Sequence, residues 1–176
     1  MRYAQIRELD ISNGEGIGVA LFVQGCHFHC YNCFNPDTWD FNGGKEWTQD
    51  TEDKLIELAN KPYIKRLSIL GGEPLADENL DGVLHLVDRF RLSFPNKSIW
   101  LYSGYKFEDC LIKPKTCEEN IFRALRYEIL KNVDVMVDGK YIDSQRNVQA
   151  KWRGSDNQRV IDVKESLQSE RVVLYD

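Results

Sequence analysis

Three cysteines near the start of the sequence are the residues best suited to chemistry. Cys26, Cys30 and Cys33 form a CxxxCxxC pattern inside the loop 25–34. Cysteine thiolates are the usual ligands of iron–sulfur clusters, and a four-iron cluster normally takes four of them. Three neighbouring thiolates would leave one iron free to bind a small molecule, which is what a catalytic cluster requires.

A zinc site is the main alternative for this loop. Zinc also binds thiolates, and His27 or His29 could supply a fourth ligand. Structural zinc sites usually combine two short ligand pairs that lie apart in the sequence, and here only one such group is present. We therefore favour a cluster, keep a noncatalytic zinc or iron–sulfur module as an alternative, and expect both histidines to pack in the loop. Cys110 and Cys117 are expected to be structural.

The composition indicates one ordinary globular domain over residues 1–176. Hydrophobic residues make up 42% and charged residues 29%, and no linker or repeat interrupts the chain. The net charge of −5 argues against nonspecific binding of nucleic acid. The sequence has neither the apolar core of a signal peptide nor a run long enough to cross a membrane. We expect a cytoplasmic protein whose thiols stay reduced.

Apolar runs that end in glycine-containing turns predict the strands. These runs are Gly18–Gln24, Arg66–Leu70, Ser98–Tyr102 and Val133–Val137, and a fifth strand-like segment is Val160–Val163. Each of the first four is rich in aliphatic or aromatic residues, as expected of a strand buried on both faces. The loops after these strands are built for tight turns.

Helical patterns separate the predicted strands. Leu80, Val83, Leu84, Val87 and Phe90 share one helix face, and a shorter helix is expected around Leu55 to Ala59. A capping box at Thr116–Glu119 predicts a third helix, with Ile121, Phe122, Leu125 and Ile129 as its apolar stripe.

Alternating strands and helices predict the fold class. We expect a single α/β domain with a mainly parallel sheet. A complete eight-stranded barrel needs about 250 residues, so this chain can form only a partial (β/α) barrel. Ligands of parallel sheets collect at the carboxyl ends of the strands, where the cysteine loop also lies.

Three other loops are expected near that edge, and each also has a purely structural interpretation. Gly71–Pro74 combines two glycines with the carboxylate of Glu73, which could accept a cation, but it could equally be a strand-ending turn. Tyr102–Tyr105 should border the site. Asp138–Tyr141 could be a turn with a solvated ion pair. A further segment, Trp152–Arg159, precedes the last strand-like run and by itself indicates a surface loop.

CxxxCxxC after a first strand, followed by Gly-Gly-Glu-Pro after a second, resembles the motifs of the radical S-adenosylmethionine enzymes. The resemblance implies that Cys26, Cys30 and Cys33 hold three irons of a [4Fe-4S] cluster. The fourth iron would then bind the amino and carboxylate groups of S-adenosylmethionine. The residues that the resemblance places around S-adenosylmethionine are Asn32, Cys33, Phe34, Gly71, Gly72, Glu73 and Pro74, with Phe34 near the adenine and Gly72 near the methionyl group.

Within that group, SGY, VDGKY and RGSxNQR on a short chain resemble the family that activates anaerobic ribonucleoside-triphosphate reductases. This resemblance runs from Asp10 to about Arg159. Asp156 stands where a small hydroxyl residue is common, and residues 164–176 form a C-terminal extension past the usual end.

The family resemblance implies a radical reaction and two protein partners. S-adenosylmethionine would be cleaved reductively, and a hydrogen atom would be taken from a glycine of the reductase large subunit, leaving a glycyl radical. No general acid or base is needed. A one-electron donor such as a flavodoxin is implied as well. The alternative within the same chemistry is activation of another glycyl-radical enzyme, although those activators commonly have longer chains.

Overall fold

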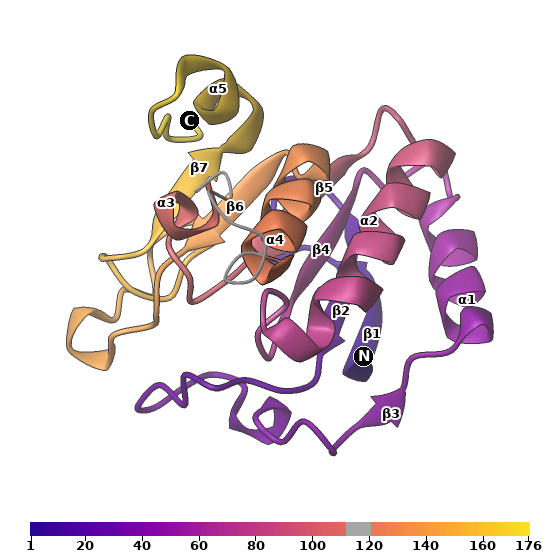
Figure 1. Ribbon diagram of the computed structural model, residues 1–176, viewed down its shortest axis with the longest axis horizontal. Coiled ribbons are helices and arrows are strands. Elements are labelled where there is room, and N and C mark those ends of the chain that lie inside the picture. The colour runs from indigo at the N-terminus through magenta and orange to yellow at the C-terminus, as the bar shows by residue number, and fades with distance from the viewer. Residues whose placement is uncertain (112–120) are drawn as a thin grey trace.

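The computed structural model describes residues 1–111 and 121–176 as one α/β domain (Figure 1). The predicted capping box at Thr116–Glu119 and the structural role expected of Cys117 lie outside the described residues. A single seven-stranded sheet runs through the domain, in the order β3-β1-β2-β4-β5-β6-β7.

The middle of the sheet is parallel and its edges are antiparallel. The strands are β1 (Arg2–Asp10), β2 (Gly18–Val23), β3 (Lys45–Glu46), β4 (Arg66–Gly71), β5 (Ser98–Tyr102), β6 (Val135–Asp138) and β7 (Arg159–Asp162). β2, β4, β5 and β6 are parallel neighbours, whereas β1, β3 and β7 pair in antiparallel fashion. β3 and β7 end the described sheet, so it is not closed into a barrel. The prediction of a mainly parallel, partial-barrel architecture is confirmed.

Helices cover one face of this sheet. The α-helices are α1 (Gln49–Ala59), α2 (Leu80–Ser93), α3 (Phe107–Cys110), α4 (Ile121–Asn132) and α5 (Val163–Ser169), and short 3-10 helices occupy Pro36–Thr38, Asp77–Asn79 and Asp143–Gln145. α1, α2 and α4 lie side by side in front of the sheet in Figure 1. Thr48 starts α1, because its hydroxyl accepts a hydrogen bond from the Thr51 amide at 3.2 Å. In the part of the chain that is described, no helix is long and apolar enough to span a bilayer.

Strand residues alternate between the helix-covered face and the opposite face. Leu21, Ile69 and Leu101 belong to the large core beneath the helices. Phe22 and Trp100, one position along their strands, face the other way. Apolar side chains on both faces explain why the strands appear in the sequence as continuous apolar runs.

One detail of the predicted helix stripes is wrong. Ile121 and Phe122 are exposed, although the spacing had placed them in the core. Ile129 is buried as predicted, and α4 also turns Leu130 and Arg126 inward. The Arg126 Nε donates to the Leu75 carbonyl at 2.9 Å. The buried guanidinium sets the rotation of the helix because it must keep its hydrogen-bond acceptors.

A buried ion pair fixes the end of the sheet away from the cysteine loop. Arg66 starts β4 and Asp10 ends β1; the Arg66 guanidinium donates to the Asp10 carboxylate at 2.7 Å, and both side chains are fully buried. Arg66 also donates to the Glu15 carbonyl, so it holds the segment 11–17 against the sheet. Losing one partner would leave the other charge buried and unpaired, which is costly.

Candidate active site

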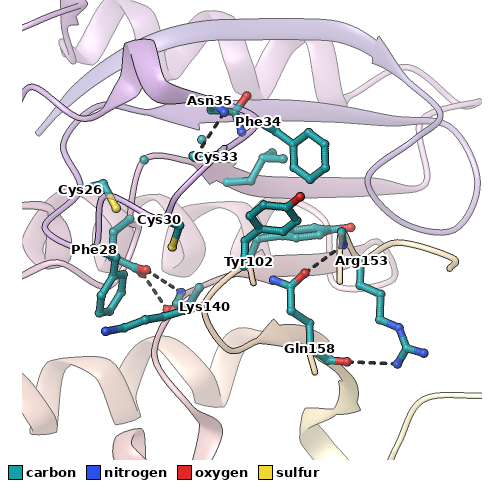
Figure 2. A pocket seen from close by; sticks show the side chains of 18 of the residues that line it. Cys26, Phe28, Cys30, Cys33, Phe34, Asn35, Tyr102, Lys140, Arg153 and Gln158 are labelled. Atoms are coloured by element: carbon teal, nitrogen blue, oxygen red, sulfur yellow. Dashed lines mark hydrogen bonds between the residues drawn. The ribbon is translucent and has the colours of Figure 1, made fainter. Parts of the chain in front are cut away.

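A cavity of about 540 Å³ opens at the carboxyl ends of the parallel strands. Among the residues that line it are seven of those predicted to form the site: Cys26, Cys30, Cys33, Phe34, Gly71, Gly72 and Glu73. Figure 2 shows Cys26 and Cys30 at one end of the cavity and Arg153 and Gln158 at the other, with Tyr102 between them in this view. The fold therefore brings the cysteine loop and the Gly-Gly-Glu-Pro loop to one cavity.

Two predicted residues lie beside this cavity rather than in its lining. Asn32 adopts a left-handed backbone conformation with φ of 53°, and its side-chain amide donates to Asp143 at 3.1 Å. Pro74 is buried and also falls outside the lining residues. Contacts of Asn32 and Pro74 with S-adenosylmethionine remain predictions.

The cysteine loop is held by backbone hydrogen bonds to the segment that follows it. The Gly25 amide donates to the Thr38 carbonyl at 2.8 Å, and the Cys26 amide donates to the Trp39 carbonyl at 3.0 Å. His29 stacks on Trp39, with 4.6 Å between ring centroids. His27 packs against the Phe41 ring at 4.4 Å, and its Nε2 contacts the Glu78 carboxylate. Both histidines thus pack in the loop, as expected.

All three cysteines line the cavity. Burial raises the pKa of the Cys26 and Cys30 thiols, so binding of iron must displace their protons. Over residues 1–111 and 121–176, no three His, Cys, Asp or Glu side chains converge on a point that could hold a single metal ion. Three thiol donors bordering an open cavity nevertheless fit a cluster that contacts a small molecule.

Glu73 joins three of the loops at the site. Its carboxylate accepts hydrogen bonds from the Ser103 hydroxyl and the Gly104 amide, both at 2.7 Å. Its own amide donates to the Gly25 carbonyl at 2.7 Å. The loops after β2, β4 and β5 are therefore linked through one residue, and burial raises the pKa of Glu73 to about 7.

The Asp138–Tyr141 turn does not carry the solvated ion pair considered above. Asp138 is buried and pairs with Arg159, and it also accepts from the Phe107 amide at 2.8 Å. Lys140 instead lines the cavity, with its Nζ 4.6 Å from the centre of the Phe28 ring. Local sequence does not identify this cation, because Asp138, two residues before Lys140, is an equally plausible partner for it.

The RGSxNQR segment forms a wall of the cavity rather than a separate surface loop. β7 is antiparallel to β6, so the segment that joins them, residues 139–158, begins and ends beside the carboxyl end of β6. The Gln158 amide donates to the Gly139 carbonyl and its oxygen accepts from the Gly154 amide, both at 2.9 Å. The Phe34 ring packs directly against Gly154. A Cβ at position 154 would lie 2.6 Å from the nearest atom of that ring.

Comparison with known proteins shows which family the chain resembles. The family model described as a 4Fe-4S single cluster domain matches residues 12–161. Proteins named anaerobic ribonucleoside-triphosphate reductase-activating protein are similar over most of the chain: that of Enterobacteria phage T4 is 41% identical over 91% of this chain and 93% of its own. Those of Escherichia coli (strain K12) and Vibrio cholerae serotype O1 are 36% and 39% identical, over 91% and 90% of this chain and 97% and 96% of theirs.

The chain belongs to this family of reductase-activating proteins. As a member, it is an enzyme with a 4Fe-4S domain. The matched range 12–161 contains the whole cysteine loop and the Gly-Gly-Glu-Pro loop. Cys26, Cys30 and Cys33 are the thiols within it that line the cavity. We therefore assign the cluster of this activating protein to these three residues as a proposal.

The raised pKa of Glu73 predicts a pH-dependent stability for the cluster-free activating protein. The folded carboxyl titrates near 7, above the ordinary 4.5, so the folded chain holds this proton more tightly than the unfolded chain. Its contribution to the free energy of unfolding therefore falls as pH rises between these values, by at most about 3 kcal/mol. Glu73→Gln removes this titration.

Denaturant unfolding of both proteins at about pH 5 and about pH 8 measures the effect. The free energy of unfolding of the wild type minus that of Glu73→Gln should be smaller at the higher pH. Groups that titrate alike in the two proteins cancel in this difference. A difference independent of pH would contradict the burial-raised pKa.

Proposed function

We propose that this protein activates an anaerobic ribonucleoside-triphosphate reductase by forming a glycyl radical in its large subunit. Cys26, Cys30 and Cys33 would hold a [4Fe-4S] cluster. When bound and reduced, this cluster supplies the electron that breaks a carbon–sulfur bond of S-adenosylmethionine, giving methionine and a carbon radical that takes a hydrogen atom from the glycine.

One observation carries this proposal: the cysteine loop and the Gly-Gly-Glu-Pro loop line the same cavity and are bonded to each other. The bond from the Glu73 amide to the Gly25 carbonyl fixes their relative position. A module that only stored metal would not need a second, glycine-rich loop beside its thiols. The names of the relatives support the reductase as the protein acted upon.

The chain's own residues position and shield the ligand. The backbone of Gly71 and Gly72 offers a surface without side chains at which the methionyl part can lie. Lys140 lines the cavity near Cys30 (Figure 2), and its ammonium group is suited to a carboxylate. Phe34, packed on Tyr141 with centroids 4.9 Å apart, provides an aromatic face for the adenine.

We further propose a one-electron donor such as a flavodoxin and a cytoplasmic setting. The cluster needs an external electron for each turnover, and its free thiols need reducing surroundings before iron is inserted.

Anaerobic reconstitution tests the proposal. The purified chain would be loaded with iron and sulfide, reduced, and given S-adenosylmethionine and purified reductase. We expect a [4Fe-4S] paramagnetic resonance signal that changes when S-adenosylmethionine is added, formation of 5′-deoxyadenosine, and a glycyl radical signal in the reductase. Stoichiometric zinc, or a cluster whose paramagnetic resonance signal does not change with S-adenosylmethionine, would favour the noncatalytic module.

A second assay separates the two activase alternatives. If 5′-deoxyadenosine forms but the radical appears only in a different glycyl-radical enzyme, the radical chemistry stands and the reductase is the wrong partner.

A further inference from the structure

The last residues of the chain, 170–176, form a tail that is held against the sheet. The tail follows α5 and lies beyond the segment that matches the family model. It pairs with the outer edge of β7, where the Tyr175 amide donates to the Val160 carbonyl at 2.9 Å. The Asp162 amide donates back to the Val173 carbonyl at the same distance. The tail therefore has a fixed position in the fold.

Tyr175 belongs to an aromatic cluster on the face of the sheet away from the helices. Its ring lies edge-on to that of Trp100, with 5.3 Å between centroids, and to that of Trp152, with 5.9 Å. Trp100 and Trp152 contact each other in the same way at 4.8 Å. Edge-to-face contacts at these distances are favourable. Three rings, from β5, the segment 139–158 and the tail, thus support one another.

Trp152 lines the cavity and depends on this support. Its backbone φ is 60°, in the left-handed region that residues other than glycine seldom adopt. Such a conformation is costly and persists only where the surrounding contacts hold it. The aromatic cluster holds the Trp152 ring, so it also fixes the backbone of the adjoining Arg153, which lines the cavity as well.

The aromatic cluster also contacts a second wall of the cavity, the segment 11–17. A Cβ at Gly14 would lie 2.7 Å from the Trp100 ring, so the backbone of this segment packs directly on that ring. The Tyr175 hydroxyl donates to the Glu15 carboxylate at 2.7 Å. The residues of this segment that line the cavity are Ser12 and Asn13. Tyr175 therefore ties the two walls together.

Both walls lie away from the thiols. Figure 2 shows Arg153 at the end of the cavity opposite Cys26 and Cys30. The Asn13 carbonyl accepts a hydrogen bond from the hydroxyl of Ser68, which stands well before the carboxyl end of β4. The cysteine loop, in contrast, follows the carboxyl end of the neighbouring β2. S-adenosylmethionine bound at the cluster would leave this other end to the reductase segment that carries the target glycine.

We propose that Tyr175 is a positioning residue that, through Trp152, keeps the end of the cavity away from the thiols in the shape that receives the glycine-bearing segment of the reductase. This inference rests on the proposed function and deepens it. Tyr175 is not among the cavity-lining residues, so it acts through its neighbour. Loss of its ring would free Trp152 to leave the left-handed conformation and would move the wall that the reductase segment contacts.

The experiment measures saturation by the reductase separately from S-adenosylmethionine binding. With the loaded protein, S-adenosylmethionine and reductant present, the initial rate of glycyl radical formation is followed over a range of reductase concentrations. In Tyr175→Ala we expect the half-saturating reductase concentration to rise about three- to tenfold, because Trp152 must be ordered again when the reductase binds. Affinity for S-adenosylmethionine should be unchanged, because the thiol end keeps its shape.

A Trp152→Ala background tests whether Tyr175 acts through Trp152. Trp152→Ala alone should raise the half-saturating reductase concentration as Tyr175→Ala does. Adding Tyr175→Ala to it should then have no further effect, since the two residues work as a unit.

Two variants of the tail are matched controls. Tyr175→Phe keeps the ring and removes only the hydrogen bond to Glu15, so its effect should be smaller than that of Tyr175→Ala. Leu174 is the preceding residue and is 58% exposed, so Leu174→Ala should be saturated by the reductase like the wild type.

Several outcomes would overturn this inference. Wild-type saturation in Tyr175→Ala would do so, as would an equal further rise in the Trp152→Ala background. Parallel losses of S-adenosylmethionine affinity and of reductase saturation would also overturn it, because they would indicate a general loosening of the fold. If the wild type forms no glycyl radical in the reductase, the proposed function fails and takes this inference with it.

Discussion

The Cys30→Ser variant should fold normally yet lose the [4Fe-4S] cluster and all formation of 5′-deoxyadenosine. A serine hydroxyl does not ionise as a thiol does, so only two thiolates remain to hold the irons. Cys30 is partly exposed, and its side chain contributes little to the core. Iron and sulfide content, the cluster's absorption and 5′-deoxyadenosine after anaerobic reconstitution measure this effect.

Cys110→Ser is the control for this prediction. Cys110 is buried, and its thiol donates to the Lys106 carbonyl at 3.6 Å, a bond that a serine hydroxyl can replace. It should keep the iron content and activity of the wild type. Full cluster content in Cys30→Ser, or its loss in Cys110→Ser, would contradict the assignment of the ligands.

The Gly72→Ala variant should separate the two loops that form the site. A Cβ at Gly72 would lie 2.4 Å from the Gly25 carbonyl oxygen and 3.0 Å from that of Thr38, and both neighbours are backbone atoms that cannot rotate away. We expect a loss of about 1–3 kcal/mol in the free energy of unfolding. Formation of 5′-deoxyadenosine should fall on the order of a hundredfold, because a displacement of about 1 Å is enough to spoil the alignment of reacting groups.

Gly82→Ala makes the same chemical change inside α2. A Cβ there would meet the Met1 side chain, whose own Cβ would lie at 2.7 Å, rather than backbone atoms. It should cost less stability than Gly72→Ala and leave 5′-deoxyadenosine formation unchanged, since alanine favours a helix over glycine by about 1 kcal/mol and this gain offsets the displacement of Met1. Denaturant unfolding and 5′-deoxyadenosine formation are measured on both variants. Wild-type values in Gly72→Ala would show that the loops are not packed as described.

The parallel centre of the fold could be predicted from the sequence because its strands have a strong local signal. Ser98–Tyr102 is predicted and observed with the same bounds, and Gly18–Gln24 is one residue too long. Edge strands have a weaker signal. β1 (Arg2–Asp10) is partly exposed and contains polar residues throughout, so neither continuous apolar character nor a strict alternation identified it.

The sequence by itself determined the chemistry of the site. Three thiols within one short loop restrict the ligand to a soft metal or a cluster, and the resemblance of that loop and of Gly71–Pro74 to known motifs supplies the rest. These are properties of residue type and local spacing. They do not depend on how distant segments meet.

Only the tertiary structure decided which residues complete the cavity and which do not. Asp138 pairs with Arg159 rather than Lys140, Lys140 faces the cavity, and Tyr102 keeps a buried hydroxyl without a partner. Each outcome depends on contacts between segments that the sheet brings together: β6 with β7 for Asp138, and β2 with β4 and β5 for Tyr102. The pairing of those strands determines which partners a side chain can reach. Local sequence does not contain this information, because the partners are distant in the chain.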